Sequence, residues 1–307
     1  MKRAVNCGLV KADNMKQAIL LLSFGTPRQP SDLLPYLTSI QRGKIPTERE
    51  LKVLTARYDA IGQWDNKLLQ TMGEEQKRTL KSLLAIDAMY LAYLHMPNSM
   101  EQAIESIATA GYTSILCIVT SPFYSMIGTG AYERKLHSIL RAYPDISCEI
   151  IKSWWNRPQF FEYWRSQLMA ANPLQADTAC IFSAHSVPIS TVGSYEDEVM
   201  SASNQIAKMV GLNHWYQAWQ SAAPYGEWLG PTIESVIEQA LIDGAKRIVC
   251  IPFGFVSDHV EILYDNDIIC RNIVENAGAT YERLPMPNGN TLFMEAMAKA
   301  IRERINK

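Results

Sequence analysis

The sequence predicts an α/β fold of two similar Rossmann-like halves, each a four-stranded parallel sheet flanked by helices, with the active-site cleft between them. First, apolar runs alternate with amphipathic segments, as expected for strands joined by right-handed helical crossovers. Second, one pattern occurs twice: Ala103–Gly111 and Val236–Gly244 each read as a helix ending in glycine, and each precedes an apolar run that contains a cysteine. This recurrence predicts two halves of similar structure.

Eight segments are predicted to be strands, and the early ones have the near-continuous apolar composition typical of strands buried on both faces of a parallel sheet. They are Ala18–Ser23, Met89–Leu94, Ile115–Thr120, Cys148–Ser153, Thr178–Ser183, Trp215–Trp219, Arg247–Pro252 and Thr280–Leu284. The segments between them place apolar residues at helical spacing. The predicted helices are Glu48–Tyr58, Glu74–Leu84, Met100–Ala110, Pro158–Ala170, Asp197–Val210, Pro231–Ile242 and Thr291–Arg304.

The chain is long enough for two domains of ordinary size, since it has 307 residues, of which 48% are hydrophobic and 20% charged. We expect residues 15–157 and 290–307 to form the N-terminal half, residues 158–289 the C-terminal half, and residues 1–14 a loose extension. The net charge of -2 gives no reason to expect nucleic-acid binding. No apolar run reaches the roughly 18–20 residues of a membrane span, and the N-terminus has no apolar stretch typical of a secretory signal.

The six cysteines predict a reduced, cytoplasmic protein. They include no CxxC pair, and their spacing does not indicate a structural zinc site or an iron–sulfur cluster. Three of them, Cys117, Cys180 and Cys250, lie inside apolar strands, where a free thiol behaves as a small hydrophobic group. The chain also lacks the glycine-rich and nucleophile motifs of dinucleotide enzymes, P-loop proteins and serine hydrolases.

The segment after the seventh predicted strand is the most informative part of the chain. It reads as a turn at Gly254 followed by a helix capped by Ser257 or Asp258. On such a helix Asp258, Glu261 and Asp265 share one face. Stacked like charges destabilise an ordinary helix, so the row indicates a path for a cation or for protons. The alternative is a solvated acidic helix start, which the helix dipole favours.

A histidine follows the fifth predicted strand. His185 lies between Ser183 and Ser186, and we expect it to face Glu261 across the cleft. Histidine and glutamate together are suited to binding Fe(II) or to removing protons near neutral pH. The alternative is a hydrogen-bonded structural histidine. His259 falls on another face of the predicted helix and is expected to be structural or supporting.

Aromatic residues gather at the predicted strand ends and in the loops beside them. A flat hydrophobic ligand fits walls of this kind, although each ring alone is equally compatible with core packing. These residues are Phe24, Phe123, Tyr124, Tyr132, Trp219, Tyr225, Trp228, Phe253 and Phe255.

Several of these segments, taken together and in this order, resemble the ferrochelatase family. The resemblance covers nearly everything from Met15 to the C-terminus, and the compact length is most similar to Gram-positive, coproporphyrin-type members. The matching segments are Phe24–Pro27, Arg57–Gly62, Ser153–Trp155, Ser183–Pro188, Trp219–Ser221, Trp228–Pro231, Phe255–Tyr264 and Tyr264–Asp267.

The resemblance implies insertion of Fe(II) into a porphyrin in haem biosynthesis. Coproporphyrin III is the expected substrate and protoporphyrin IX the alternative, with Fe(II) as the second substrate and no organic cofactor. His185 corresponds to the family's catalytic histidine, and Glu261 to its catalytic glutamate on the opposite side of the macrocycle. Asp265 matches an acidic line attributed to metal or proton traffic, so these three residues form the expected metal-binding set.

The resemblance also implies a porphyrin pocket of Phe24, Arg42, Asn66, Tyr132, Trp219 and Ser221. Arg42 and Tyr132 match positions that contact propionates, and His95 resembles a pocket histidine. The chain departs from the coproporphyrin-type pattern at four positions. These are Phe24 in place of tyrosine, Gln41 in place of a second arginine, Asn66 in place of serine and Ile269 in place of glutamate.

Two other functions stay open from the sequence. Phe24 and Ile269 are also compatible with a non-catalytic porphyrin or haem carrier. A histidine and carboxylate set does not select strongly among metals, so a cobalt or nickel chelatase acting on another tetrapyrrole is a further alternative. The expected partners are the porphyrin and Fe(II), with transient contact with other haem-pathway enzymes.

Overall fold

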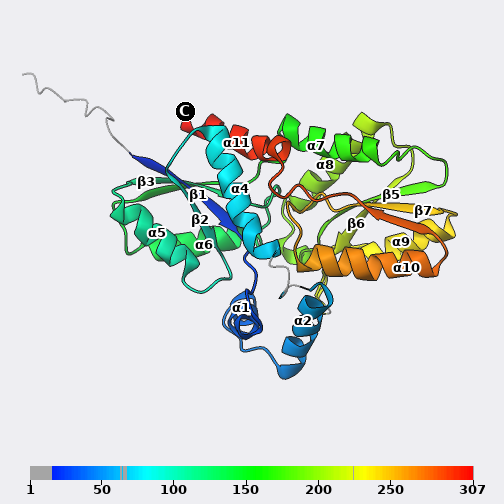
Figure 1. Ribbon diagram of the computed structural model, residues 1–307, viewed down its shortest axis with the longest axis horizontal. Coiled ribbons are helices and arrows are strands. Elements are labelled where there is room, and N and C mark those ends of the chain that lie inside the picture. The colour runs from blue at the N-terminus through cyan, green and yellow to red at the C-terminus, as the bar shows by residue number, and fades with distance from the viewer. Residues whose placement is uncertain (1–15, 63, 65–67, 224, 307) are drawn as a thin grey trace, which may run out of the picture.

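Two four-stranded parallel sheets form the framework of the protein (Figure 1). The computed structural model describes residues 16–62, 64, 68–223 and 225–306. The strand orders are β2-β1-β3-β4 and β6-β5-β7-β8, the same order in both halves, so the prediction of two similar halves is confirmed. Each predicted strand is present, as β1 (Gln17–Ser23), β2 (Met89–Tyr93), β3 (Ser114–Val119), β4 (Ser147–Ile151), β5 (Thr178–His185), β6 (Trp215–Gln220), β7 (Arg247–Ile251) and β8 (Thr280–Arg283).

Helices flank both sheets, and each predicted helix is present, although α4 begins at Leu68, six residues before the expected start at Glu74. Further helices, α1, α6 and α10, were not predicted. The helices are α1 (Leu33–Ile40), α2 (Glu48–Ala60), α4 (Leu68–Leu84), α5 (Ser99–Thr109), α6 (Thr129–Leu140), α7 (Pro158–Ala170), α8 (Tyr195–Val210), α9 (Ile233–Ile242), α10 (Arg271–Asn276) and α11 (Thr291–Ile305). Within these described residues no helix is both long and apolar enough to cross a membrane.

The repeated sequence pattern corresponds to a repeated structure. Gly111 follows α5 and Gly244 follows α9, and their φ angles of 78° and 100° lie in the left-handed region that favours glycine. The chain then enters β3 or β7, where Cys117 and Cys250 are fully buried beside the central strand of each sheet. The two glycines therefore end equivalent helices in the two halves.

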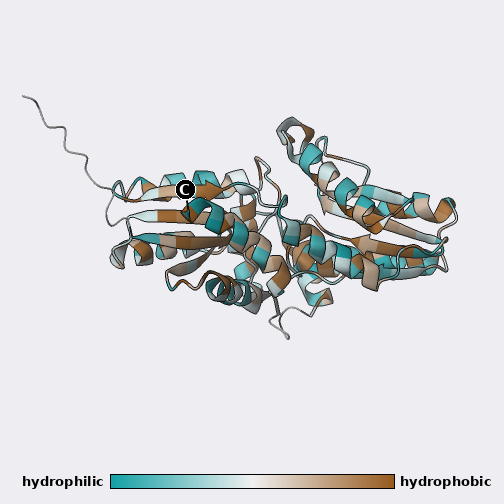
Figure 2. Ribbon diagram, turned by 90° about the horizontal axis from the view of Figure 1, so that it is seen from above, coloured by the Kyte–Doolittle hydropathy of each residue, from teal (hydrophilic) through white to brown (hydrophobic). Residues whose placement is uncertain are grey.

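The inner strands β1, β3, β5 and β7 are apolar along most of their length because both of their faces are buried. In β1, Ile19 and Leu21 face one core cluster, while Leu20 and Leu22 face another on the opposite side of the sheet. In Figure 2 the strands are mostly brown, and the helices outside them mix teal and brown. Burial on both faces removes the alternation of polar and apolar residues that a half-exposed strand would show.

One of the cores is shared by the two halves. Phe123, which follows β3, packs edge-on against Phe253, which follows β7, with ring centroids 5.6 Å apart. Helix α11 packs against both α4 and α7, and its Phe293 lies 5.5 Å from the ring of Trp154. The last helix thus joins the halves. The assignment of residues 15–157 with 290–307 to one half, and 158–289 to the other, stays a prediction.

The segment after β7 differs from the prediction. Its turn at Gly254 is confirmed, because the Gly254 N–H donates to the Ser183 carbonyl (3.1 Å) and a Cβ at position 254 would lie 2.5 Å from the Cβ of Ala184. The expected cap at Ser257 or Asp258 is wrong, since helical structure begins only at Val260. It continues as a π-helix over Glu261–Cys270. This form is rare in proteins, and where it occurs it is often at a functional site.

Candidate active site

A cavity of about 310 Å³ lies between the halves, at the carboxyl ends of the strands. Phe24 follows β1 and Ser121 follows β3, so the first half supplies one part of the lining. His185 ends β5 and Phe255 follows β7, so the second half supplies the other. The cleft predicted at the strand ends is therefore confirmed, as expected for parallel α/β sheets.

His185 and Glu261 form an ion pair in the wall of this cavity. The Nε2 atom of His185 lies 3.5 Å from Oε1 of Glu261, and the two side chains keep 36% and 30% of their surface open. The Nδ1–H of His185 donates to the Ser186 carbonyl (2.5 Å). This bond leaves Nε2 as the nitrogen that faces Glu261 and the cavity. The Tyr195 hydroxyl donates to the backbone carbonyl of His185 (2.9 Å) and holds the end of the strand.

The pair is polarised toward imidazolium and carboxylate. Burial opposes the charge on His185, but Glu261, the Ser186 carbonyl and Asp265 outweigh it and raise the histidine pKa to about 9. Burial likewise opposes the charge on Glu261, yet His185, His259 and Arg57 lower the glutamate pKa to about 2. At neutral pH His185 therefore carries a proton on Nε2 as well as on Nδ1, while the Glu261 carboxylate is ionised.

The two side chains do not face each other across the cleft as expected. Non-bonded carbon atoms prefer separations of about 3.5–4.0 Å, so a flat ring between two groups needs roughly twice that distance. The 3.5 Å separation of His185 and Glu261 leaves no room for a macrocycle between them. The expectation of opposite sides is wrong for this structure, because both side chains belong to one wall. Their catalytic roles stay predictions.

Asp265 is not part of a common metal-binding set with this pair. Its carboxylate accepts a hydrogen bond from the Ser221 hydroxyl (2.8 Å) and lies 3.6 Å from the Arg57 guanidinium. Asp258 also departs from the expected acidic row, since it lies before the π-helix and pairs with Arg283. In the part of the chain that the structure describes, no group of three His, Cys, Asp or Glu side chains is arranged to hold a metal ion.

The other predicted pocket residues differ in where the structure places them. Phe24 and Tyr132 line the cavity, and the Phe24 ring lies 4.4 Å from that of His95. Arg42 is exposed at the end of α1 and does not line the cavity. Trp219 and Ser221 do not line the cavity; Trp219 is buried and packs against Tyr195 with ring centroids 5.7 Å apart. Asn66 lies outside the described residues.

Several lining residues were missed by sequence reasoning. Arg28 lines the cavity and also borders a neighbouring hollow of about 360 Å³ formed with Tyr36, His95 and Met96. Its position directly after the Phe24–Pro27 motif was a signal that could have identified it. Tyr195 left no such signal, because its hydroxyl bonds to a backbone carbonyl ten residues earlier, and no sequence motif marks such a bond.

Comparisons with known proteins identify the family. The ferrochelatase family matches residues 16–305. The coproporphyrin III ferrochelatase of Geobacillus kaustophilus (strain HTA426) is 33% identical over 301 residues, covering 93% of this chain and 95% of that protein. The coproporphyrin III ferrochelatase of Staphylococcus aureus (strain N315) is 31% identical over 303 residues, with coverages of 94% and 98%.

Solved structures show the same fold at low sequence identity. SirB from Bacillus subtilis with Fe³⁺ has a TM-score of 0.61 at 13% identity, covering 94% of this chain and 95% of that one. CbiX, described as the terminal enzyme of sirohaem biosynthesis in denitrifying bacteria, has a TM-score of 0.55 at 13% identity, with coverages of 93% and 98%. The resemblance predicted from the sequence is confirmed over almost the whole length, and the chain belongs to the ferrochelatase family.

Proposed function

We propose that this protein inserts Fe(II) into coproporphyrin III to give coprohaem, as a step of haem biosynthesis. The observation that carries the proposal is the His185–Glu261 pair, which opens into a cavity between two halves. The full-length similarity to proteins named coproporphyrin III ferrochelatase supports the choice of porphyrin.

The pair supplies the two kinds of chemistry that the reaction needs. Insertion of Fe(II) releases the two pyrrole protons of the porphyrin, so the site requires metal donors and proton acceptors. The Glu261 carboxylate is ionised and offers oxygen donors, and the Nε2 atom of His185 becomes a metal donor and a proton acceptor once it has lost its own proton. The cavity lining is mostly apolar, and we propose that the site binds a distorted macrocycle better than the flat ground state.

The propionate groups of the porphyrin require cationic partners. Arg28 is the arginine that the described part of the chain contributes to the cavity lining, and no described lysine lines the cavity. Guanidinium groups bind carboxylates with two parallel hydrogen bonds, and of the two exposed arginines Arg28 and Arg42 only Arg28 lines the cavity, so Arg28 is the proposed propionate contact. Tyr132, buried in the same lining, is retained as a second contact.

An anaerobic insertion assay with coproporphyrin III and protoporphyrin IX, using the wild type and His185→Ala, tests the proposal. We expect the wild type to insert Fe(II) with preference for coproporphyrin III. His185→Ala should fold normally and lose insertion, because the side chain opens into the cavity and not into a core. A preference for protoporphyrin IX would show that the proposed choice of coproporphyrin III as substrate is wrong. Tight binding of both porphyrins with no insertion by the wild type would instead support the carrier function.

We also infer a cytoplasmic location. The described cysteines are free thiols, even where Cys117 and Cys148 bring their sulfur atoms within 3.6 Å of each other. Free thiols in proximity are typical of a reducing compartment. Transient contact with other haem-pathway enzymes stays part of the proposal.

A further inference from the structure

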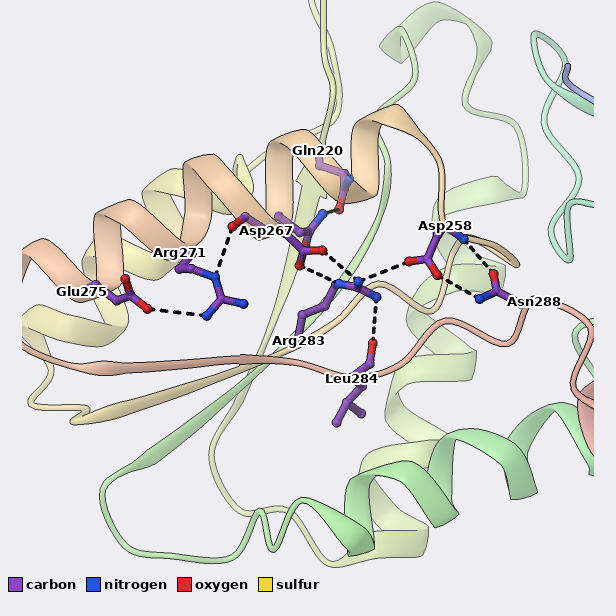
Figure 3. A network of polar contacts seen from close by, with 9 residues as sticks. Gln220, Asp258, Asp267, Arg271, Glu275, Arg283, Leu284 and Asn288 are labelled. Atoms are coloured by element: carbon purple, nitrogen blue, oxygen red, sulfur yellow. Dashed lines mark hydrogen bonds and ion pairs between the residues drawn. The ribbon is translucent and has the colours of Figure 1, made fainter. Parts of the chain in front are cut away.

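Arg283, at the end of β8 and outside the cavity lining, binds two carboxylates that bracket Glu261 in the chain (Figure 3). Its Nε and Nη2 atoms donate to Oδ1 and Oδ2 of Asp267 at 2.7 and 2.8 Å. The same Nη2 lies 3.2 Å from Oδ1 of Asp258, and the arginine side chain is only 14% exposed. Forked arginine–carboxylate bonds of this kind are strong and fix geometry. One guanidinium therefore joins the chain before Glu261 to the chain after it.

The segment that presents Glu261 has little support of its own. Residues 255–259 belong to no helix or strand, and no side chain caps the start of the π-helix. The Glu261 N–H donates to Nδ1 of His259 (3.2 Å), a neighbour within the same segment. The position of the Glu261 carboxylate consequently depends on contacts that other elements provide.

Asn288 extends the Arg283 contacts to the first half of the molecule. It accepts from the Asp258 N–H (2.9 Å) and donates through Nδ2 to the Asp258 carboxylate (2.8 Å). Its own N–H donates to the carbonyl of Val256 (2.9 Å). From α4, Gln76 donates to the Asn288 carbonyl (3.3 Å), and Gln76 also lines the cavity. A continuous polar connection thus runs from the cavity wall of one half to the π-helix of the other.

The ion pairs in this region divide the acidic side chains among different cations, and Glu261 is the one that pairs directly with His185. Asp258 and Asp267 pair with Arg283, and Asp265 pairs with Arg57. Removal of Arg283 would leave two largely buried carboxylates without a cation, which is strongly unfavourable. Their movement toward water would displace the segment that holds Glu261.

We propose that Arg283 is a positioning residue that, with Asp258, Asp267 and Asn288, holds Glu261 in contact with His185. Arg283 contacts neither substrate. Its effect on turnover rests on the proposed function, whereas its effect on the Glu261 segment does not. The test therefore combines a kinetic measurement with one that needs no turnover.

The decisive comparison is Arg283→Met against Arg271→Met. Arg271 begins α10, directly after the π-helix, and its described contacts are the Asp267 carbonyl, Glu275 and the ring of Tyr281. We expect Arg283→Met to lower kcat at least about tenfold, as losses of supporting contacts around metal sites do. Porphyrin Kd, measured by fluorescence, should change much less. Hydrogen exchange at the Ile262 and Leu263 amides, which bond to the His259 carbonyl, should become faster. Arg271→Met should change none of these.

Two further variants keep the proposal falsifiable. Arg283→Lys retains the positive charge but cannot make the two parallel hydrogen bonds to Asp267, and it should restore part of the lost kcat. If Arg283→Met does not fold, Asp258→Asn removes the charge facing Arg283 while conserving shape, and it should show the same split between kcat and Kd. A kcat equal to that of the wild type in the folded variants, or an equal loss in Arg271→Met, would overturn the proposal. If the wild type inserts no iron, the proposed function fails; unchanged amide exchange in Arg283→Met would then overturn the positioning role separately.

Discussion

His185 must lose a proton before its Nε2 atom can bind iron. The other ring nitrogen already donates to the Ser186 carbonyl, and Glu261 stabilises the imidazolium form against the effect of burial, which gives a pKa of about 9. Metal binding competes with the proton for the same lone pair. Because the histidine pKa is raised, the competing proton is present at neutral pH and is lost as the pH rises toward 9.

We therefore predict that KM for Fe(II) decreases as the pH rises. Below the histidine pKa the fraction of neutral imidazole falls about tenfold per pH unit, so KM should change by up to about that factor between roughly pH 7 and 8. Anaerobic initial rates at several pH values, with saturating porphyrin, provide the measurement. A KM that stays constant over this range would mean that iron does not bind at Nε2 of His185.

At the scale of one element, the π-helix contains a carboxyl group that favours its neutral form. Burial and the neighbouring Glu261 raise the pKa of Asp265 to about 6, and Arg57 and Ser221 only partly oppose this. A raised pKa means that the folded state binds the proton more tightly than the unfolded chain. The contribution of Asp265 to stability is therefore present below about pH 4 and is lost as the pH rises through about 6.

Asp265→Asn should accordingly stabilise the protein at neutral pH. The side chain is only 11% exposed, and a pKa raised by about two units corresponds to at most roughly 3 kcal/mol. We expect a higher thermal midpoint at pH 7.5 and a smaller gain near pH 4.5, measured by calorimetry in matched buffers. A lower midpoint at both pH values would show that the Arg57 and Ser221 contacts outweigh the cost of the buried charge.

The elements differ in how far the sequence could predict them. β1 was evident because burial on both faces makes a strand apolar throughout, and the glycines after α5 and α9 marked helix ends. The π-helix was not predictable, since its hydrogen bonds leave no distinct pattern of side chains. The cap was misplaced for a related reason: Asp258 bonds to Asn288 and Arg283, both distant in sequence, in place of the nearby helix start.

The candidate site shows the same division between local and distant information. His185 and Glu261 were identified from their residue types at strand ends, and they do meet. Their placement on one wall depends on how the turn after β7 packs against β5, where Gly254 lies against Ala184. No local sequence pattern encodes this contact. Arg42 matched a family position, but the end of α1 leaves it exposed, and Arg28 lines the cavity.

At the scale of the whole molecule, the two halves should unfold together because they share a core. Phe293 of α11 is fully buried against Trp154, Tyr163 and other rings, in a cluster with members from both halves. Phe293→Ala should cost about 3–5 kcal/mol of unfolding free energy while keeping one cooperative transition.

Denaturant unfolding, followed by tryptophan fluorescence and far-ultraviolet circular dichroism, measures both quantities. Ile305→Ala is a matched control at the end of the same helix, where the side chain is 44% exposed and a change within about 0.5 kcal/mol is expected. Two separate transitions in the wild type would contradict a shared core, as would a loss in Phe293→Ala no larger than that of the control.

The placement of His185 and Glu261 on one wall has a consequence for the timing of the proposed reaction. For a macrocycle lying against that wall, incoming iron and departing protons would meet the same two side chains, and we expect the two transfers to occur in succession. The second face of the ring then needs no reactive group. Phe24, which lines the cavity with a side chain that has no oxygen, is compatible with such a one-sided exchange.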